Sequence, residues 1–469
     1  MGMDDHPVVI IGAGPAGLTA AYELVKRNIR PIVVEKANIV GGLARTEIYK
    51  GYRFDLGGHR FFTKIKEVKH LWQEMLNENF LKVHRLSRIH HQGHFINYPI
   101  NLFNVISNFG IFESVLILLS YLKTKLRPYP EEETFEQWVT NRFGSRLYKT
   151  FFQSYTEKVW GIPCHMIQSD WAAQRIKGLS LISAVSNALF RSNHIKTLVN
   201  EFHYPVLGAG MMWQHFQKVV ESLGGEICLN TEIIRLRHEG YRIKGITAQQ
   251  KGKLFEISGT HFISTMPLNE LLTRLEPPPP KDVIKSAHKL NYRASILVGI
   301  ILDKADLFQD QWIYVHNPEV RVGRIQNYKN WSIDMVPDPT KTSLGMEYFC
   351  TEGDAFWAMS DDELLDLATR ELTRLGLAHI ADVKDGVVFR QPKAYPVYDR
   401  DYRKQLKVVQ QFIETINDLQ TIGRNGLHCY NNQDQSMLTA MLAVKNLFGE
   451  NNDLWSVNTE QFYHEEFTA

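Results

Sequence analysis

Apolar and polar positions at the start of the chain follow two different periods. Val8–Ile11 is a short continuous apolar run, as in a buried strand, and Leu18, Tyr22 and Val25 then recur at helical spacing. A second apolar run, Pro31–Glu35, follows after a short connection. Strand, helix and strand in this order predict a βαβ unit and therefore a parallel sheet.

Between about residues 100 and 195 the pattern becomes helical. Thr134 and Gln137 have the spacing of a capping box at the start of one helix. The segment Leu102–Leu122 is the most apolar of the chain, but two asparagines and a glutamate leave it short of the ~20 clean apolar residues that a membrane span requires. We expect a buried or surface-seated helix, with contact to lipid as the open alternative.

Strand patterns return on both sides of the run Pro277–Pro280, which interrupts any helix and marks a boundary. The segments with a strand pattern are 226–229, 233–236, 262–265, 294–302 and 344–349. An amphipathic helix opened by Ser360 and Glu363 interrupts the later strands, and a last helix runs through Met437 to Leu447. The second half of the chain therefore predicts a further sheet.

Together these patterns predict an α/β fold of three parts. The first is a discontinuous Rossmann-like domain for a dinucleotide, made of residues 1–95, 196–287 and 406–469. A helical domain, residues 96–195, is inserted into it, and residues 288–405 form a second, antiparallel-sheet domain for the substrate.

Acidic and basic residues are nearly balanced in this chain of 469 residues, with 53 Lys and Arg against 51 Asp and Glu. A balanced charge does not favour a nucleic-acid partner, and attraction for an anionic ligand has to come from a few local arginines. We therefore expect no nucleic-acid partner.

The cysteines are few, far apart and without a C-x-x-C pair, which fits neither a metal site nor a disulfide framework. The chain also enters its first strand almost at once, leaving no room for a cleaved signal peptide. These features predict no metal and a cytoplasmic setting, with peripheral contact at the inner membrane face left open. The cysteines are Cys164, Cys228, Cys350 and Cys429.

The turn after the first strand has the G-x-G-x-x-G spacing of a dinucleotide site. Gly12 suits the tight turn, Gly14 lets the backbone approach a pyrophosphate, and Gly17 lets helix and strand pack closely. The helix N-terminus supplies N–H donors to the phosphates. Glu35, at the end of the next strand, can accept hydrogen bonds from a ribose.

A second glycine pair decides which dinucleotide is expected. Gly41 and Gly42 are followed by Arg45 and a hydroxyl residue. The stretch resembles the extended fingerprint of the glutathione-reductase-like flavoproteins, in the branch of amine oxidases, protoporphyrinogen oxidases and UDP-galactopyranose mutases. The resemblance implies FAD, with Arg45 near the phosphates or the flavin.

The next motif, Gly57-Gly58-His59, resembles the histidine loop of UDP-galactopyranose mutases, which lies against the flavin. Arg60 departs from that family, in which an apolar or small residue follows the histidine. Further stretches similar to the same family, in the same order, are 155–163 with 171–175, 204–210, 312–314, 323–328, 423–430 and 432–437.

Carried over by this resemblance, Arg175 and Arg324 grip the diphosphate of a nucleotide sugar, for which guanidinium forks are suited. Together with His59, which tunes the flavin, they form the expected catalytic set. The expected substrate-binding residues are Trp160, Arg175, Tyr314, Arg324, Asn327, Tyr395 and Tyr430. The expected cofactor-binding residues are Gly12, Gly14, Ala16, Gly17, Glu35, Lys36, Gly41, Gly42, Arg45, Gly57, Gly58, Gly423, Arg424, Asn432, Gln433, Asp434 and Ser436.

The resemblance implies a nucleotide-sugar pyranose/furanose mutase in which N5 of reduced FAD is the nucleophile at the anomeric carbon. NAD(P)H is the candidate reductant of the flavin, and monomer and oligomer both fit the sequence. The main alternative is an FAD-dependent oxidoreductase of the amine oxidase or protoporphyrinogen oxidase type that works by hydride transfer. A second alternative is a flavin-bound protein that binds a sugar or lipid without turnover.

Overall fold

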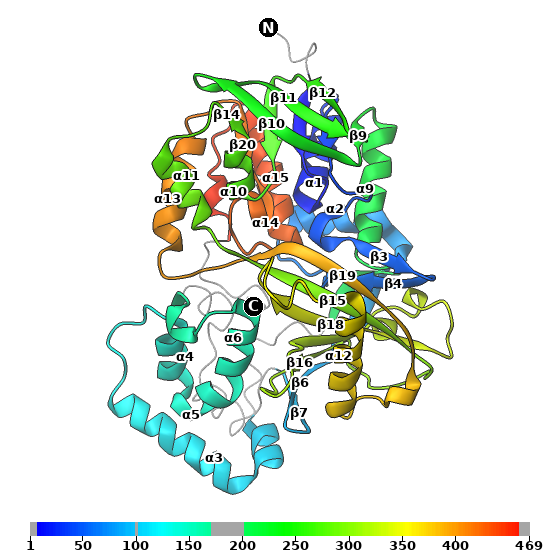
Figure 1. Ribbon diagram of the computed structural model, residues 1–469, viewed down its shortest axis with the longest axis vertical. Coiled ribbons are helices and arrows are strands. Elements are labelled where there is room, and N and C mark those ends of the chain that lie inside the picture. The colour runs from blue at the N-terminus through cyan, green and yellow to red at the C-terminus, as the bar shows by residue number, and fades with distance from the viewer. Residues whose placement is uncertain (1–6, 99–101, 170–200, 459–469) are drawn as a thin grey trace.

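The computed structural model describes residues 7–98, 102–169 and 201–458 of the chain. Figure 1 shows two lobes, with the N-terminal strand and the C-terminal helix side by side in the upper lobe and a second sheet beside a group of helices in the lower one. This arrangement confirms the predicted α/β fold with a parallel sheet, an inserted helical part and a second sheet.

The upper lobe is built on a five-stranded parallel sheet with the order β20-β13-β1-β2-β9. Its strands are β1 (Val8–Ile11), β2 (Ile32–Val34), β9 (Glu226–Cys228), β13 (His261–Ser264) and β20 (Leu419–Thr421). Successive side chains of a strand point to opposite faces. Val8 and Ile10 accordingly pack into one hydrophobic cluster, and Val9 and Ile11 pack into another. Because both faces are buried, β1 reads as a continuous apolar run.

Helices cover one face of this sheet and a smaller sheet covers the other. The helices are α1 (Pro15–Val25), α2 (Lys66–Leu76), α9 (Gly210–Ser222) and α15 (Gln433–Leu447). The smaller sheet has the order β12-β11-β10-β14 and consists of β10 (Thr231–Glu239), β11 (Arg242–Gln250), β12 (Lys253–Ile257) and β14 (Leu275–Glu276). It packs with α10 (Leu268–Thr273), α11 (Lys281–His288) and α13 (Tyr402–Ile413).

The second large sheet has seven strands in the order β19-β15-β18-β17-β16-β6-β7. They are β6 (Ser87–His91), β7 (His94–Asn97), β15 (Tyr292–Leu302), β16 (Trp312–Val315), β17 (Arg324–Asn327), β18 (Thr342–Cys350) and β19 (Val383–Pro396). Every neighbouring pair is antiparallel except β16 and β6, which run parallel. Helix α12 (Asp361–Arg374) packs on its outer face and begins at the predicted Ser360–Glu363 capping box.

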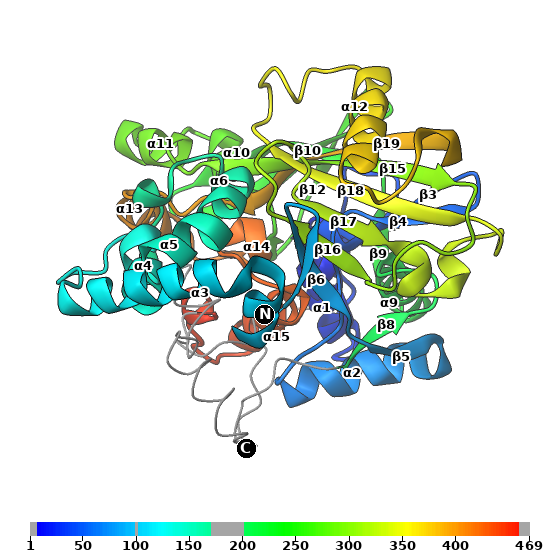
Figure 2. The same cartoon turned by 90° about the horizontal axis from the view of Figure 1, so that it is seen from below.

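The remaining described helices are α3 (Leu102–Leu126), α4 (Phe135–Phe143), α5 (Ser145–Leu147) and α6 (Ser154–Trp160). Thr134 and Gln137 form the predicted capping box of α4. Figure 2 shows α3, α4, α5 and α6 together at one side of the seven-stranded sheet, away from α12. Two further antiparallel pairs are formed by β3 (Thr46–Tyr49) with β4 (Tyr52–Asp55), a hairpin, and by β5 (Phe80–His84) with β8 (Glu201–Pro205), which are distant in sequence.

The predicted division of the chain differs from the observed pairing at one boundary. Segments 1–95, 196–287 and 406–469 each supply strands to the parallel sheet, but β6 and half of β7 also fall within 1–95. These two strands pair with β16 and complete the seven-stranded sheet instead. The edge of β16 offers unpaired backbone groups, and β6 satisfies them.

Among the described helices, none combines the length and the apolar character needed to cross a bilayer. The backbone dihedral angles of Gly110 are not helical. Beyond Gly110, helix α3 has one buried side and one exposed side. Ile117 and Tyr121 are buried against the rest of the helical part. The opposite side exposes Phe112, Val115, Leu118, Leu119, Leu122 and Leu126, between 47% and 83% of each side chain.

Candidate active site

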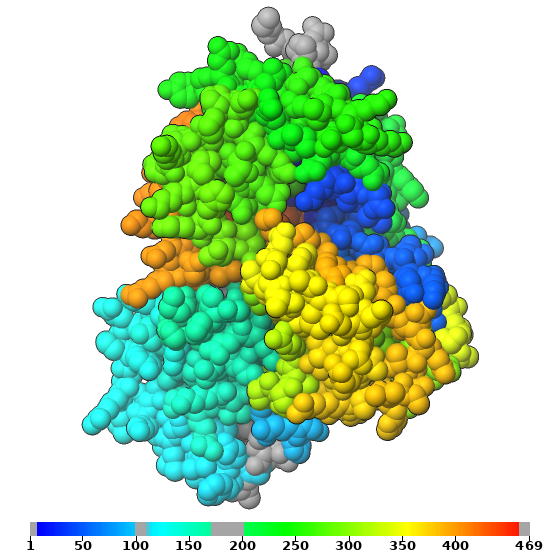
Figure 3. All heavy atoms as spheres, in the orientation of Figure 1, coloured from blue at the N-terminus to red at the C-terminus, as the bar shows by residue number. Residues whose placement is uncertain are grey.

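A cavity of about 760 Å³ is lined by residues of both large sheets. Its lining starts at the carboxyl ends of β1 and β2, passes the loop of residues 57–60, and continues to β16, β17 and α6. In the space-filling view the surface is hollowed where the blue N-terminal part, the green part above it and the yellow part below it meet (Figure 3). Crevices at the carboxyl ends of parallel strands are the usual ligand sites of such sheets.

The first glycine turn is shaped by close contacts. Gly12 has a φ of +101°, and a Cβ there would lie 2.1 Å from Thr265 Oγ1. A Cβ on Gly17 would lie 1.9 Å from the carbonyl oxygen of Gly12, so Gly17 serves the packing of helix on strand and does not line the cavity. Larger residues at either position would force the turn apart.

Gly14 and Gly42 bring two backbone turns together beside the start of α1. A Cβ on Gly42 would lie 3.1 Å from Gly14 Cα, and both glycines line the cavity. Helix α1 begins at Pro15 and presents its N-terminal N–H groups there. The bare backbone and the helix dipole suit a pyrophosphate at this point.

Glu35 closes the same end of the cavity. Its Oε2 accepts a hydrogen bond of 2.7 Å from the Ala13 amide, and its Oε1 accepts one of 2.8 Å from the Ala37 amide. A carboxylate offers about four lone-pair sites, so acceptor capacity remains for ribose hydroxyls. Lys36 and Ala16 line the cavity nearby, whereas Gly41 shapes the second turn with a φ of +106° and is not part of the lining.

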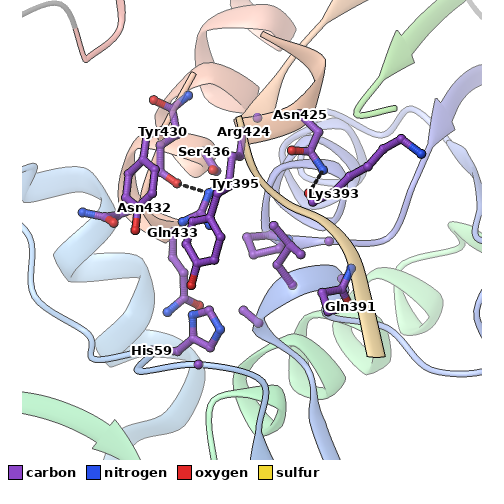
Figure 4. A pocket seen from close by; sticks show the side chains of 18 of the residues that line it. His59, Gln391, Lys393, Tyr395, Arg424, Asn425, Tyr430, Asn432, Gln433 and Ser436 are labelled. Atoms are coloured by element: carbon purple, nitrogen blue, oxygen red, sulfur yellow. Dashed lines mark hydrogen bonds between the residues drawn. The ribbon is translucent and has the colours of Figure 1, made fainter. Parts of the chain in front are cut away.

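At the other end, α15 points its N-terminus at the cavity. Asn432 caps the helix, and its first turn belongs to the lining. Figure 4 shows Asn432, Gln433 and Ser436 together at the start of this helix, above His59 in the view. Gly423, with a φ of +78°, would place a Cβ 3.0 Å from the Ala16 side chain, so the turn before α15 sits directly against α1. The predicted cofactor positions Gly423, Arg424, Asn432, Gln433, Asp434 and Ser436 all line the cavity.

Two arginines fix the backbone around the cavity, Arg45 beside the second glycine turn and Arg424 before α15. Arg45 donates to Gly42 O and to Gln391 Oε1, at 3.0 and 2.7 Å, and pairs with Glu47. Arg424 donates to backbone carbonyls and lies 4.7 Å above the Tyr430 ring. Both side chains fix the backbone around the cavity and also contribute positive charge to it.

His59 lies in the loop that faces this wall. Burial, with the positive charges of Arg424 and Arg324, lowers the pKa of His59 to about 3. The imidazole is therefore neutral at ordinary pH and acts as a hydrogen-bonding group without charge. Gly57 and Gly58 precede His59 and line the cavity, and a Cβ at either position would make only ordinary contacts of 3.4 Å or more.

Arg324 is the central cation of the cavity. Its Nη2 lies 2.7 Å from Glu347 Oε1 and 2.6 Å from the hydroxyl of Tyr395, which itself donates to Glu347 Oε1 at 2.8 Å. Burial alone would lower the pKa of Arg324, but the buried Glu347 carboxylate raises it well above its ordinary value. Arg324 Nε meets no acceptor in the described part of the chain.

Aromatic rings surround this cation. The rings of Tyr395 and Tyr430 are stacked, with centroids 5.6 Å apart and planes 15° apart. Trp160 lies 6.2 Å from Tyr430, and Tyr314 faces Arg324 across the β16–β17 ladder. Burial raises the pKa of Tyr395 well above its usual value, so its phenol stays protonated and can donate.

One predicted substrate residue points elsewhere. Asn327 is buried, donates to Phe308 O at 3.2 Å and does not line the cavity. Because strand side chains alternate, Arg324 and Gln326 share the cavity face of β17 and Asn327 lies on the other. Arg175 falls outside the described residues.

Several lining residues were not predicted. Trp312 and Gln326 lie two residues from Tyr314 and Arg324, so the period of a strand would have found them. Tyr155, Thr156, Phe151 and Phe152, close to Trp160, also line the cavity. Residues contributed by sequence-distant loops include Thr265, Met266, Arg274, Trp331, Gln391 and Lys393, for which no motif gave a signal.

The site suits FAD on two observations. The bare Gly14–Gly42 contact leaves room for a pyrophosphate beside the N-terminus of α1, and a second helix, α15, presents donors to the far part of the cavity. Fold and cavity thus define a dinucleotide-binding protein of the flavoprotein class. Residues 15–398 match the family of flavin containing amine oxidoreductases. The chain belongs to that family, which implies FAD as its cofactor.

Solved structures superpose on nearly the whole length of this chain. Reduced UDP-galactopyranose mutase superposes with a TM-score of 0.84 at 21% identity, covering 98% of this chain and 99% of that one. A putative protoporphyrinogen oxidase from Exiguobacterium sp. 255-15 reaches 0.72 at 15% identity, covering 95% and 99%. At these identities the likeness shows the fold.

Matches in sequence are shorter. Probable flavin-containing monoamine oxidase A of Dictyostelium discoideum is 28% identical over 148 residues, which is 29% of this chain and 32% of that protein. Thioredoxin reductase of Mycolicibacterium smegmatis is 37% identical over 65 residues, 13% of this chain and 21% of that protein. The chain therefore spans about a third or less of these relatives.

Proposed function

We propose that this FAD-dependent enzyme is a nucleotide-sugar pyranose/furanose mutase. The observation that carries the proposal is Arg324, a cation with a buried, unpartnered Nε that Glu347 and Tyr395 hold in the aromatic part of the cavity, beyond the His59 loop. A fixed guanidinium among tyrosine hydroxyls suits a diphosphate, which accepts several charge-assisted hydrogen bonds. The full-length likeness to a UDP-galactopyranose mutase supports the same assignment.

In this proposal the protein positions the substrate and stabilises the leaving group. Bound reduced FAD supplies the nucleophilic nitrogen for the anomeric carbon. Arg324, held by Glu347, stabilises the negative charge of the departing diphosphate without having to reorganise. Tyr395 and Tyr430 donate to or stack on the ligand, and Arg175 is proposed as the second guanidinium of the clamp.

His59 is proposed to set the environment of the flavin. Burial and the nearby arginines lower the pKa of His59 to about 3, so its imidazole is neutral at ordinary pH and is a weak proton acceptor. In this proposal the imidazole donates or accepts a hydrogen bond with the flavin and packs against it.

The competing function is oxidation of an apolar substrate by hydride transfer. Phenylalanines Phe135, Phe143, Phe151 and Phe152 line one part of the cavity and suit such a substrate. Arg324 and Arg424 oppose the entry of a cationic amine, because like charges repel in a low dielectric. A flavin-bound protein without turnover is the third candidate.

The deciding experiment incubates the dithionite-reduced holoenzyme with UDP-galactopyranose and separates the products by chromatography. Furanose product supports the mutase. Reduction of the oxidised flavin by an amine or a porphyrinogen, without furanose product, would establish the oxidase instead. Binding of UDP-sugars with no product of either kind would indicate a flavin-bound protein that binds them without turnover. NAD(P)H is the proposed reductant and is tested by anaerobic bleaching of the flavin absorbance.

We also propose peripheral contact of α3 with the cytoplasmic face of a membrane. The exposed apolar side chains between Phe112 and Leu126 fall within an arc of about 120° at 3.6 residues per turn. Exposed Lys123, Lys125 and Arg127 flank that arc. An apolar stripe bordered by basic residues suits the interface of an anionic bilayer. The four cysteines, all free, fit a reducing compartment.

A further inference from the structure

The central cation of the cavity stands at the end of a strand ladder. Arg324 and Tyr314, which both line the cavity, are the last paired residues of β17 and β16 and form the terminal rung of that ladder. Beyond this rung the chain turns through residues 316–323, and the Val315 amide donates to the Gly323 carbonyl oxygen at 2.8 Å. The position of this turn therefore determines where both side chains of the terminal rung lie in the cavity.

Helix α6 is fastened to this turn by one ammonium group. Lys158 Nζ donates to the carbonyl oxygen of Asn317 at 2.6 Å. It also donates to those of Val315 and Val322, at 3.2 and 3.3 Å. Val315 directly follows the terminal rung on β16, and Val322 lies two residues before it on the way into β17. An ammonium group has three protons to donate, and backbone carbonyls accept all of them here.

A carboxylate holds the same turn through its amides. Glu371, on α12 and only 6% exposed, accepts hydrogen bonds from the Arg321 amide at 2.6 Å and from the Val322 amide at 3.0 Å. Val322 therefore donates its N–H to an anion, and its carbonyl oxygen accepts from the Lys158 cation. Hydrogen bonds to charged groups are stronger than those between neutral ones, so charged side chains from two different helices fix the turn.

Helix α6 also supplies a wall of the cavity on either side of Lys158. Tyr155 and Trp160 line the cavity, and the Tyr155 ring meets the Tyr314 ring edge-on, with centroids 5.6 Å apart. The Tyr155 ring stacks on His316 of the turn, with centroids 4.8 Å apart. Lys158 itself is not part of the lining. It therefore joins two walls of the cavity without reaching the space between them.

The charge of Lys158 has no counter-ion at bonding distance. No carboxylate in the described ranges forms an ion pair with it, and Glu371 and Glu319 act on it only from further away. Burial disfavours the charged form and lowers the pKa of Lys158 to about 8, against the opposing effect of these two carboxylates. Lys158 therefore loses its proton just above neutral pH. Other ionisable groups next to it in the chain or in space are Glu157, His316 and Arg293.

We propose that Lys158 is a positioning residue that couples α6 to the terminal rung, so that its ammonium group sets the affinity of the cavity for a nucleoside diphosphate without touching it. The proposal rests on the diphosphate site proposed at Arg324. Loss of the proton leaves two N–H donors for three carbonyls and removes the charge that strengthens these bonds. The turn is then held less firmly, and the terminal rung and the α6 wall no longer keep the spacing that a bound diphosphate requires.

The test measures the affinity of the oxidised FAD holoenzyme for UDP between pH 7 and pH 9 by isothermal titration. The affinity of the unaltered protein should fall at least fivefold, with a midpoint near the pKa of Lys158, while the flavin absorbance shows that FAD stays bound. Lys158→Arg keeps its charge throughout this range, so its affinity for UDP should not change with pH.

Lys158→Met removes the donors altogether. It should bind UDP at least tenfold more weakly than the unaltered protein at pH 7, and its affinity should not fall further up to pH 9. Any pH dependence that arises from UDP itself would remain in this variant. Lys285→Met, at an exposed lysine of α11, is the matched control and should follow the unaltered protein at every pH.

An affinity for UDP that stays constant from pH 7 to pH 9 in the unaltered protein would overturn the proposal and leave the diphosphate site intact. An equal fall with pH in Lys158→Met would assign the effect to another group and overturn it too. Absence of UDP binding at every pH would overturn the mutase function and this proposal with it. Where Lys158→Met does not retain FAD, the profiles of the unaltered protein and of Lys158→Arg decide.

Discussion

Arg324 and Glu347 stand opposite each other on β17 and β18, and their side chains meet at 2.7 Å with the Tyr395 hydroxyl bonded to both. Glu347 is fully buried, whereas Arg324 retains 19% exposure toward the cavity. The carboxylate thus fixes one edge of the guanidinium and leaves the other for a ligand.

Replacing the cation tests its role in binding. Arg324→Ala should weaken UDP binding at least a hundredfold, because a charge-assisted fork to phosphate is lost, while FAD stays bound. Isothermal titration of the holoenzyme with UDP measures the first effect and the flavin absorbance the second. Arg370→Ala, on the surface of α12, is the control. Unchanged UDP affinity in Arg324→Ala would contradict the clamp.

Replacing the anion tests its role in stability. Glu347→Ala leaves Arg324 without its buried partner and should lower the free energy of unfolding by about 3 kcal/mol. Glu347→Gln keeps an acceptor and should cost less. Urea denaturation of the two variants measures the difference. A loss below about 1 kcal/mol in Glu347→Ala, judged against typical single substitutions, would show that the pair is not structurally important.

The contact between the two glycine turns should decide whether FAD binds. Gly42→Ala places a Cβ 3.1 Å from Gly14 Cα at a φ of +53°, and we expect the variant to purify largely without flavin. Gly353→Ala introduces similar backbone strain at a φ of +83° but meets nothing within 4 Å. The ratio of flavin to protein absorbance measures occupancy. A full complement of FAD in Gly42→Ala would exclude a close approach of the cofactor there.

Buried histidines should make the protein sensitive to acid. Burial lowers the pKa of His316 to about 3, below its ordinary value of 6.5. Below pH 6.5 the unfolded chain takes up a proton that the folded protein does not, so stability falls as the pH falls. Between pH 7.5 and 5.5 this histidine should account for a loss of about 1 kcal/mol.

His316→Phe tests that expectation, because a phenyl ring can keep the stacking on Tyr155, whose ring lies 4.8 Å away. The free energy of unfolding of the variant should change less between the two pH values than that of the unaltered protein. The same replacement at His288, on the last turn of α11, is the control. An unchanged pH dependence in His316→Phe would show that other groups cause it.

The outer face of α3 should bind anionic vesicles. Leu119→Glu introduces a charge into the apolar arc and should reduce co-sedimentation with phosphatidylglycerol vesicles severalfold. Leu223→Glu, at a similarly exposed leucine beyond α9, should leave binding unchanged. Co-sedimentation that is absent for the unaltered protein, or insensitive to Leu119→Glu, would refute the membrane contact.

The sequence predicted the parts of the fold that depend on local patterns. Val8–Ile11, the glycine turn and the two capping boxes at Thr134 and Ser360 are each encoded within a few neighbouring residues, and the structure has them where expected. The placement of β6 beside β16 depends on a pairing across more than 200 residues, for which no local signal exists.

The candidate site was predictable to the extent that motifs describe it. The glycine turns and the start of the C-terminal helix predicted the residues at the cofactor end of the cavity. Asn327 shows the limit of such a prediction, because a motif does not tell on which face of a strand a side chain lies. Glu347 was missed because a buried acid in an apolar strand carries no motif, although it determines how Arg324 is held.

The order of strands in the parallel sheet has a consequence for how the protein is made. Strand β1 is synthesised first, yet β13 and β20, which extend the sheet on one side of it, come from residues 261–264 and 419–421. The turn at Gly423 and helix α15, which complete the cavity, follow only then. The two halves of the cavity can therefore meet only after residues 419–447 have been synthesised, and we expect FAD to bind only after that point.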